Sequence, residues 1–271
     1  MATKTKTEET ALAQKQDSLA AFPVFAPDQR EDAMEAISTN LGSGIKITDL
    51  TKVTVPLGGG LAFNVMTAEG PSSENTLTGI ILLAQEGKAL FLKSMEEAPN
   101  SPPACYSNDG IIGIGDPFET GEVREHKCAT CPKNQFGSAT RGSGKGKACK
   151  DTRPLFLLEQ GSVLPTIVQV PPTSLKHLQK YMGTLCKGGI PYYGVVVEIG
   201  LAQEQTPPPM HSILTFKSVC IIDREQRAAV KEFRAIFEKF AAQAVPSQDE
   251  YQPPADNSSQ EDYNPFPEEE V

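Results

Sequence analysis

The chain has 271 residues, with 25 Lys and Arg against 34 Asp and Glu, a formal net charge of −9 and 39% hydrophobic residues. This length suits one domain with appendages or two small domains. Eight acids and no bases lie in residues 246–271, so this segment carries −8 and the other residues together carry −1. The overall acidity therefore does not exclude a nucleic-acid partner for the folded part.

The sequence has the features of a soluble cytoplasmic protein. Its first residues, MATKTKTEET, lack the apolar core of a secretory signal, and no apolar run approaches the roughly 20 residues of a membrane span. Thiols stay reduced in the cytoplasm. The six cysteines are therefore interpreted as metal ligands or core residues rather than disulfides.

In chain order, residues 1–20 are polar and without periodicity, which predicts a disordered arm. Residues 31–41 place apolar side chains on one side of a short helix that ends before Gly42. Most of the following apolar runs are short and separated by Gly-containing or Pro-containing turns. They predict strands at 52–56, 61–66, 77–84, 89–93, 155–158, 164–170, 192–201 and 212–223.

Two further helices are predicted. One has Ser174 as its N-cap and ends at Gly188, and the other spans residues 224–244. The order of three strands, a helix and two strands is typical of an OB-fold. We expect a mainly β protein with flanking helices (α+β), an OB-like barrel over residues 21–245. Residues 101–153 lack a core pattern and read as an insertion.

The insertion carries a Cys128-Ala-Thr-Cys131 knuckle, with Cys105 upstream and Cys149 downstream. Four thiolates in a segment without its own core predict a structural zinc ion, Zn²⁺, because coordination replaces missing hydrophobic burial. The alternatives are an iron–sulfur cluster, a redox-active pair and four unrelated cysteines. His126 is interpreted as a bystander that could replace Cys105 as a ligand.

The remaining two cysteines, Cys186 and Cys220, are predicted to pack in the core. Each falls on an apolar face, Cys186 of the predicted helix and Cys220 of the last predicted strand.

Residues 124–153 hold eight bases and two acids, a local charge of +6. With Gly-rich backbone and one aromatic, this composition is typical of a polyanion-binding segment, although a solvated loop gives the same pattern. The run GSATRGSGKGK does not match a phosphate-binding P-loop, because no Gly-Lys pair is followed by Ser or Thr. The three histidines are scattered and no nucleophile or paired-carboxylate signature is present, so we expect no enzyme activity.

The last 26 residues are rich in Pro, Ser, Gln, Asp and Glu and are predicted to be a disordered tail. The tail places Pro265 and Phe266 among acids, which resembles the tip of bacterial single-stranded DNA-binding proteins that recruits partner enzymes. In those proteins the Phe is terminal, whereas here Pro-Glu-Glu-Glu-Val follows it. A purely solubilising tail is the alternative.

Residues 45 to 220 resemble a family of bacteriophage and mobile-element single-stranded DNA-binding proteins. The resemblance is carried by VPLGGGLAF, SNDG, CATCPKNQFGS, GKGKACK and LP followed by PPTSL. It implies an OB-type fold with a zinc-stabilised insertion, acting in phage or conjugative DNA replication and recombination within a bacterial host. It also implies aromatics where this chain has Phe63 and Phe91.

We therefore expect a non-catalytic single-stranded DNA-binding protein whose tail binds replication or recombination proteins. The stacking candidates are Phe91, Phe136, Tyr192 and Tyr193, and each could instead be a core residue. The residues expected to contact DNA are Lys133, Phe136, Arg141, Lys145, Lys147, Lys150, Arg153, Tyr192 and Tyr193. The alternative is a zinc-bearing protein adaptor that does not bind DNA.

Overall fold

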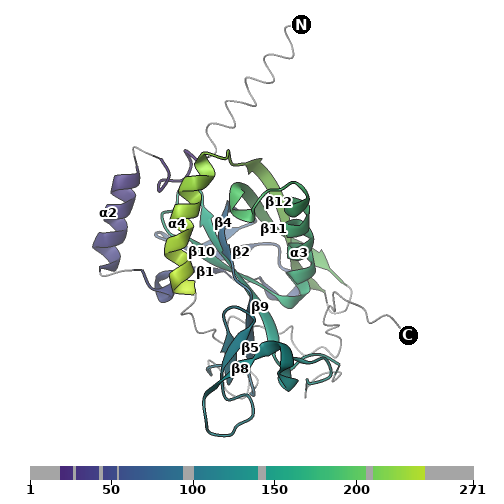
Figure 1. Cartoon of the computed structure of the whole chain (residues 1–271). Coiled ribbons are helices and arrows are strands. Elements are labelled where there is room, and N and C mark those ends of the chain that lie inside the picture. The colour runs from purple at the N-terminus through teal and green to yellow at the C-terminus, as the bar shows by residue number, and fades with distance from the viewer. Residues whose placement is uncertain are drawn as a thin grey trace.

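A computed structural model describes residues 19–26, 29–42, 45–53, 55–93, 101–139, 145–205 and 210–241 (Figure 1). The helices are α2 (Arg30–Leu41), α3 (Pro172–Lys187) and α4 (Gln226–Ala241), with 3-10 turns η1 (Ile47–Asp49), η2 (Leu57–Gly59), η3 (Cys128–Thr130), η4 (Pro132–Asn134) and η5 (Tyr192–Gly194). The strands are β1 (Lys52–Val53), β2 (Phe63–Thr67), β3 (Gly70–Glu74), β4 (Thr76–Ala84), β5 (Gly87–Leu90), β6 (Cys105–Ser107), β7 (Ile112–Gly115), β8 (Arg124–Lys127), β9 (Lys150–Glu159), β10 (Thr166–Val170), β11 (Val195–Glu204) and β12 (His211–Ile221). The protein is mainly β with flanking helices, an α+β protein as predicted. In these described ranges, no helix is long and apolar enough to span a membrane.

One large sheet has the strand order β12-β11-β4-β9-β5-β6-β7-β8, with β10 added to β9 and β1 added to β10. We call β1, β4, β9, β10, β11 and β12 the main sheet, and β5 to β8 the cysteine sheet. Strand β9 belongs to both, because residues 155–159 pair with β4 and residues 150–152 pair with β5. The expected closed barrel is not formed, since the described strands make an open sheet.

The main sheet is buried on both faces, which explains why β4 and β9 are nearly continuous apolar runs. Side chains alternate between faces, so Ile80 and Phe156 join one core cluster while Ile81 and Leu157 join the other. Within β4, a Cβ at Gly79 would lie 2.2 Å from the Leu158 carbonyl oxygen. Only glycine permits this close approach of β4 and β9.

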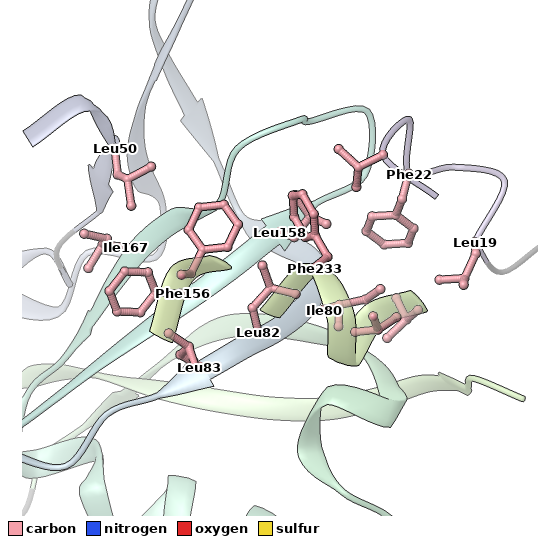
Figure 2. Packing of buried hydrophobic residues seen from close by; sticks show 14 of the residues in the cluster. Leu19, Phe22, Leu50, Ile80, Leu82, Leu83, Phe156, Leu158, Ile167 and Phe233 are labelled. Carbon is pink, nitrogen blue, oxygen red and sulfur yellow. The ribbon is translucent and has the colours of Figure 1, made fainter. Parts of the chain in front are cut away.

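Helix α4 and the N-terminal segment cover one face of the main sheet (Figure 2). Phe233 and Phe237 of α4 pack with Phe22 and Phe156 in this cluster, and Phe237 is fully buried. Helix α3 and β2 cover the other face, where Leu178 and Phe63 are buried. The face of the main sheet that carries Phe156 is therefore covered by α4 and the N-terminal segment and is not open to a ligand.

Several local predictions are corrected. The strands predicted at 52–56 and 61–66, which Gly58, Gly59 and Gly60 separate, do not pair as a hairpin: β1 pairs in parallel with β10, and β2 pairs with β3. Ser174 is not the N-cap of α3, which begins at Pro172; instead its buried Oγ accepts the Leu214 N–H at 2.9 Å. Cys186 is exposed rather than in the core, whereas Cys220 packs against a core cluster as predicted.

The insertion forms its own strands, which the sequence pattern missed. Strands β5 to β8 pair antiparallel in chain order, and β5 attaches them to the first residues of β9. Figure 1 shows β5 and β8 at the end of β9 that lies beyond the main sheet. The apolar cluster here contains as buried members only Leu90, Cys105 and Cys149, and it is far smaller than the two clusters of the main sheet.

Candidate metal centre and nucleic-acid interface

Three chain segments bring the cysteines to one corner of the cysteine sheet. Cys105 begins β6, Cys149 immediately precedes β9, and the knuckle after β8 supplies the other two: Cys128 begins the η3 turn and Cys131 follows it. The Cys131 N–H donates to the Cys128 carbonyl at 3.3 Å, which closes the knuckle. The Cys149 N–H donates to the carbonyl of Lys133 at 2.8 Å, so the start of β9 is fixed beside the knuckle.

Gly113 of β7 leaves the space in which two of the sulfurs meet. A Cβ at this position would lie 2.9 Å from Cys105 Sγ and 3.6 Å from Cys128 Sγ. Both sulfurs therefore approach the same point on β7. Cys105, Cys128 and Cys149 are buried, and Cys131 is half-buried.

Burial makes the thiols of Cys105 and Cys149 weak acids by raising their pKa. It raises the pKa of Cys105 to about 11, helped by the nearby charges of Cys128 and Cys131. Burial likewise raises the pKa of Cys149 to about 12, although the positive charge of Lys88 acts against it. Without a cation these groups are neutral thiols near pH 7, and a bound divalent metal would be needed to hold them as thiolates.

In the ranges that the structure describes, no three or more His, Cys, Asp or Glu side chains are already grouped so that they could hold a metal ion. The donor set nevertheless fits zinc chemically, because four soft sulfurs are the ligands typical of a structural zinc centre and two of them meet at the space left by Gly113. Zinc binding at Cys105, Cys128, Cys131 and Cys149 would draw the sulfurs to coordination distance.

His126 has other contacts. Its Nε2 lies 3.1 Å from the carbonyl oxygen of Gly115, and its ring meets the Phe118 ring edge-on at 5.9 Å between centroids. These contacts agree with a bystander role.

Residues 133–139 and 145–150 run beside each other, and we call them the basic hairpin. The Gly137 N–H donates to the Lys145 carbonyl at 3.0 Å, and the Ala139 N–H donates to the Gly146 carbonyl at 2.9 Å. Ser138 Oγ donates to the Lys133 carbonyl at 2.9 Å, which ties the hairpin internally. The first segment of the basic hairpin therefore begins next to Cys131, and the second segment contains Cys149.

Phe136 lies on the basic hairpin with 43% of its surface exposed. Lys147 Nζ lies 4.7 Å from the centroid of its ring, a cation–π contact. Lys133, Lys145 and Lys150 belong to the same hairpin, so five of the predicted DNA contacts are brought together. Arg141 lies outside the described residues.

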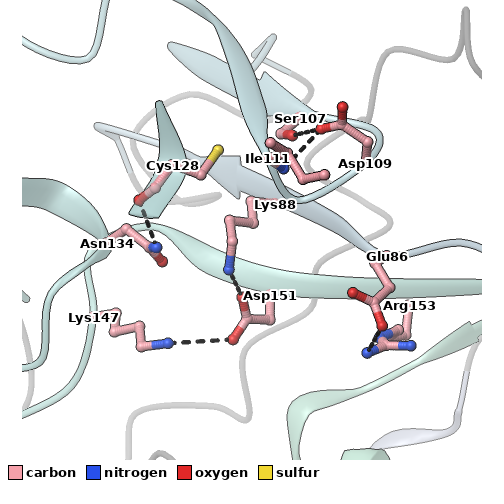
Figure 3. Close-up of polar contacts among 10 residues, drawn as sticks. All are labelled: Glu86, Lys88, Ser107, Asp109, Ile111, Cys128, Asn134, Lys147, Asp151 and Arg153. Carbon is pink, nitrogen blue, oxygen red and sulfur yellow. Dashed lines mark hydrogen bonds and ion pairs between the residues drawn. The ribbon is translucent and has the colours of Figure 1, made fainter. Parts of the chain in front are cut away.

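Ion pairs reduce the positive charge that the sequence suggested for this segment. Lys88 and Lys147 both pair with Asp151 (Figure 3). Arg153 pairs with Glu86 at 2.6 Å, and Arg124 pairs with Glu122. Glu86 and Glu122 precede the segment in sequence, so a count over residues 124–153 misses them.

The predicted tyrosines do not belong to the basic hairpin. Tyr192 and Tyr193 form the η5 turn, are half-buried, and contact Arg234 of α4, whose guanidinium lies 5.5 and 5.1 Å from their ring centroids. They pack against the core clusters of the main sheet. Phe63 is fully buried and Phe91 is half-buried, so neither is an open stacking surface.

Pro265 and Phe266 lie outside the described residues, which end at Ala241. Gln85 Nε2 donates to the carbonyl of Ala241, the last residue of α4, and to the carbonyl of Asn108, each at 2.9 Å. The end of α4 therefore lies at the base of the cysteine sheet.

The structure also brings together two histidines that are far apart in the sequence, His177 and His211. Nε2 atoms of His177 and His211 lie 4.0 and 3.7 Å from the same carboxylate oxygen of Glu204, and Lys176 lies 3.0 Å from the other oxygen. Burial lowers the pKa of His177, with Lys176 and Lys180 adding to the effect. Glu204 and His211 are cross-strand partners, which the predicted hairpin of the last two strands could have indicated.

Comparisons of the chain with protein-family models, with curated proteins and with solved structures found no match.

Proposed function

We propose that this chain is a non-catalytic single-stranded DNA-binding protein with an open OB-like core, acting in replication or recombination of a phage or mobile element. The observation that carries the proposal is the basic hairpin, which presents an exposed Phe136 among four lysines at the end of a rigid sheet. Aromatic faces that stack on bases, set among cations that contact phosphates, are the recurring means of binding single strands.

The order of the main-sheet strands supports an OB-like core. Strand β4 pairs with β9 and β11, β9 pairs with β10, β11 pairs with β12, and α3 lies between β10 and β11. These are the antiparallel pairings of the five OB strands, without the last pairing that closes the barrel. The cysteine sheet then occupies the connection between the first two strands, one of the loops with which OB-folds bind oligonucleotides.

A structural zinc ion held by Cys105, Cys128, Cys131 and Cys149 completes the proposal. Zinc supplies folding free energy to a segment that buries little apolar surface. These ligands lie at both ends of the basic hairpin, so coordination would fix the hairpin's position. The tail would recruit replication or recombination proteins through Pro265 and Phe266.

Fluorescence anisotropy of labelled oligonucleotides, single-stranded and duplex, tests the DNA-binding proposal. We expect the full chain to bind the single strand more tightly than the duplex, with affinity that falls as salt rises. No binding to the single strand at low salt would overturn the proposal.

A zinc-bearing adaptor is the second candidate, and the β7–β8 hairpin favours it. Ile111 and Val123 are 67% and 73% exposed, and Ile114 and Phe118 are exposed on the same hairpin. Apolar groups exposed together are typical of protein-binding surfaces. The anisotropy measurement separates the candidates, because an adaptor shows no salt-dependent binding to either oligonucleotide.

A further inference from the structure

Lys88 shares one face of the cysteine sheet with Cys105. It pairs with Ser107 of β6 on one side and with Asp151 of β9 on the other. Paired residues of adjacent strands project to the same face, and so do residues two apart along a strand. Cys105 lies two residues before Ser107 and Cys149 two before Asp151. The side chains of Lys88, Ser107, Asp151 and Cys105 therefore belong to one face. Cys149, just before β9, packs in one cluster with Cys105 and with Leu90, which lies two residues after Lys88 on β5.

The Lys88 side chain is held in place and largely enclosed. Only 16% of it is exposed, and its ammonium pairs with Asp151 (Figure 3). Asp151 shares its carboxylate with Lys147, whose ammonium lies 3.5 Å from the other oxygen. Asp151 therefore orients the Lys88 ammonium but shares its negative charge between Lys88 and Lys147.

The charge of Lys88 also reaches the sulfurs. Its positive charge acts on the sulfurs of both Cys128 and Cys149, which requires the Lys88 ammonium to lie near them. This electrostatic effect agrees with the shared face.

We propose that Lys88 is the internal counter-cation of the four-cysteine centre and increases its affinity for zinc. The inference rests on the proposed function, in which these cysteines bind Zn²⁺. Four thiolates and one Zn²⁺ carry a net charge of −2, and a buried net charge is costly unless a partner compensates it. Lys88 supplies one positive charge from within the fold, with Asp151 as its positioning residue.

The test is competition for zinc between the full chain and a chromogenic chelator. Lys88→Met keeps the length of the side chain and removes its charge, and we expect about 10–100-fold weaker zinc binding, as for other outer-sphere partners of metal ligands. Lys88→Arg restores the charge and should stay within about threefold of wild type. Lys127→Met is the matched control, because Lys127 is exposed on β8 and pairs with Ile112, on the opposite face from Gly113.

Cobalt absorption of the same variants reports the ligand set. A sulfur-to-cobalt charge-transfer band of wild-type shape in Lys88→Met shows that four thiolates still bind and that only affinity has changed. Equal zinc affinity of Lys88→Met and wild type overturns the inference and leaves the centre intact, and so does an equal loss in Lys127→Met. Absence of zinc binding by the wild-type chain overturns the centre itself.

Discussion

The main sheet and the cysteine sheet share strand β9 but depend on different sources of stability. The main sheet is sandwiched between two apolar clusters, with residues such as Phe156 on one face and Leu157 on the other. The cysteine sheet has Leu90 and two cysteines as the buried members of its cluster. Hydrophobic burial accounts for the first region, whereas the second lacks the apolar area that a small sheet needs to be stable.

This difference also separates a covered scaffold from the region that we propose binds DNA. Both faces of the main sheet are covered, so it offers little open surface. The cysteine sheet keeps its backbone bonded and leaves Phe136 and Lys145 of the basic hairpin exposed, while Lys133, Lys147 and Lys150 are half-buried. If a bound metal ion supplies the folding free energy of a segment, its surface positions can be polar and exposed, because apolar burial is not needed for its stability.

Removing one ligand should separate the two regions most strongly. Cys128→Ser is expected to reduce zinc from about one ion per chain to none, with loss of amide protection in β5 to β8 and retained protection in β4 and β11. Zinc binding supplies about 10–16 kcal/mol in zinc-finger peptides, so this is the largest effect we expect. Elemental analysis and hydrogen exchange measure it.

The matched variant is Cys186→Ser, since Cys186 is exposed on α3 and should be silent. Iron instead of zinc in the wild-type chain, or unchanged protection of β5 to β8 in Cys128→Ser, contradicts a structural zinc.

The converse substitution is in the core of the main sheet. Phe237→Ala removes a fully buried ring that packs against Phe233 at 5.2 Å between centroids, and we expect a loss of about 3–5 kcal/mol in the free energy of unfolding. Zinc content should not change, because Phe237 belongs to a different cluster. Urea unfolding measures the loss.

Its neighbour Ile236 is 39% exposed and serves as the control. Ile236→Ala should cost much less, on the order of 0.5 kcal/mol. Equal losses in the two variants would argue against the packing of α4 on the main sheet.

The contrast explains what the sequence could predict. Regions in which burial decides the structure carry a pattern, and α2, α4 and the β9–β10 and β11–β12 pairs are found where that pattern places them. The open edge of the sheet was not predictable, because strand periodicity does not encode whether the last pairing closes. The pairing of β1 with β10 depends on a long-range contact that local pattern does not report.

Strands β6 to β8 of the cysteine sheet were missed for the opposite reason, whereas β5 overlaps the strand predicted at 89–93. Strand β7 reads IGIG and β8 reads REHK, so neither shows apolar alternation. Position 113 of β7 is glycine because Cys105 Sγ and Cys128 Sγ approach it closely. This requirement comes from the packing of the cysteines, so it leaves no strand pattern in the sequence. The cysteine spacing predicted one site of four cysteines, which stays a prediction; the structure shows Cys105 Sγ and Cys128 Sγ approaching the same point on β7. The ion pairs of Arg153 with Glu86 and Lys88 with Asp151 could be found only from the fold.

The basic hairpin distinguishes the regions by function. Replacing Lys145, Lys147 and Lys150 together by Ala should weaken single-strand binding and reduce the salt slope by up to about 0.7 per lost phosphate contact, or about 2 in total. Anisotropy titrations over a series of salt concentrations measure both quantities. Lys217→Ala on β12 is the control from the main sheet. An unchanged slope in the triple variant would leave the hairpin as solvated surface and favour the adaptor.

Phe136 tests stacking apart from charge. Phe136→Ala should cost about 1–3 kcal/mol in single-strand affinity, because one base loses its aromatic partner. The salt slope should not change, since no cation is removed. Phe118→Ala is the matched control, being similarly exposed but on the other hairpin of the insertion. If Phe118→Ala weakens DNA binding more than Phe136→Ala, the strand binds at the β7–β8 hairpin instead.

The smallest effect is expected from residues 246–271, which carry a charge of −8 and follow Ala241 in the sequence. Ala241 accepts a hydrogen bond from Gln85 at the base of the cysteine sheet. A tethered acidic segment has an effective concentration on the order of millimolar near its anchor, so we propose that it competes with DNA for the basic hairpin. Deleting residues 248–271 should tighten single-strand binding less than tenfold at low salt. The gain should shrink at physiological salt, where the Debye length is about 8 Å. Phe266→Ala keeps the charge and should leave DNA affinity unchanged while it abolishes recruitment of a replication partner. An affinity unaltered by the deletion at low salt, together with recruitment that does not depend on Phe266, would make the tail a solubilising segment.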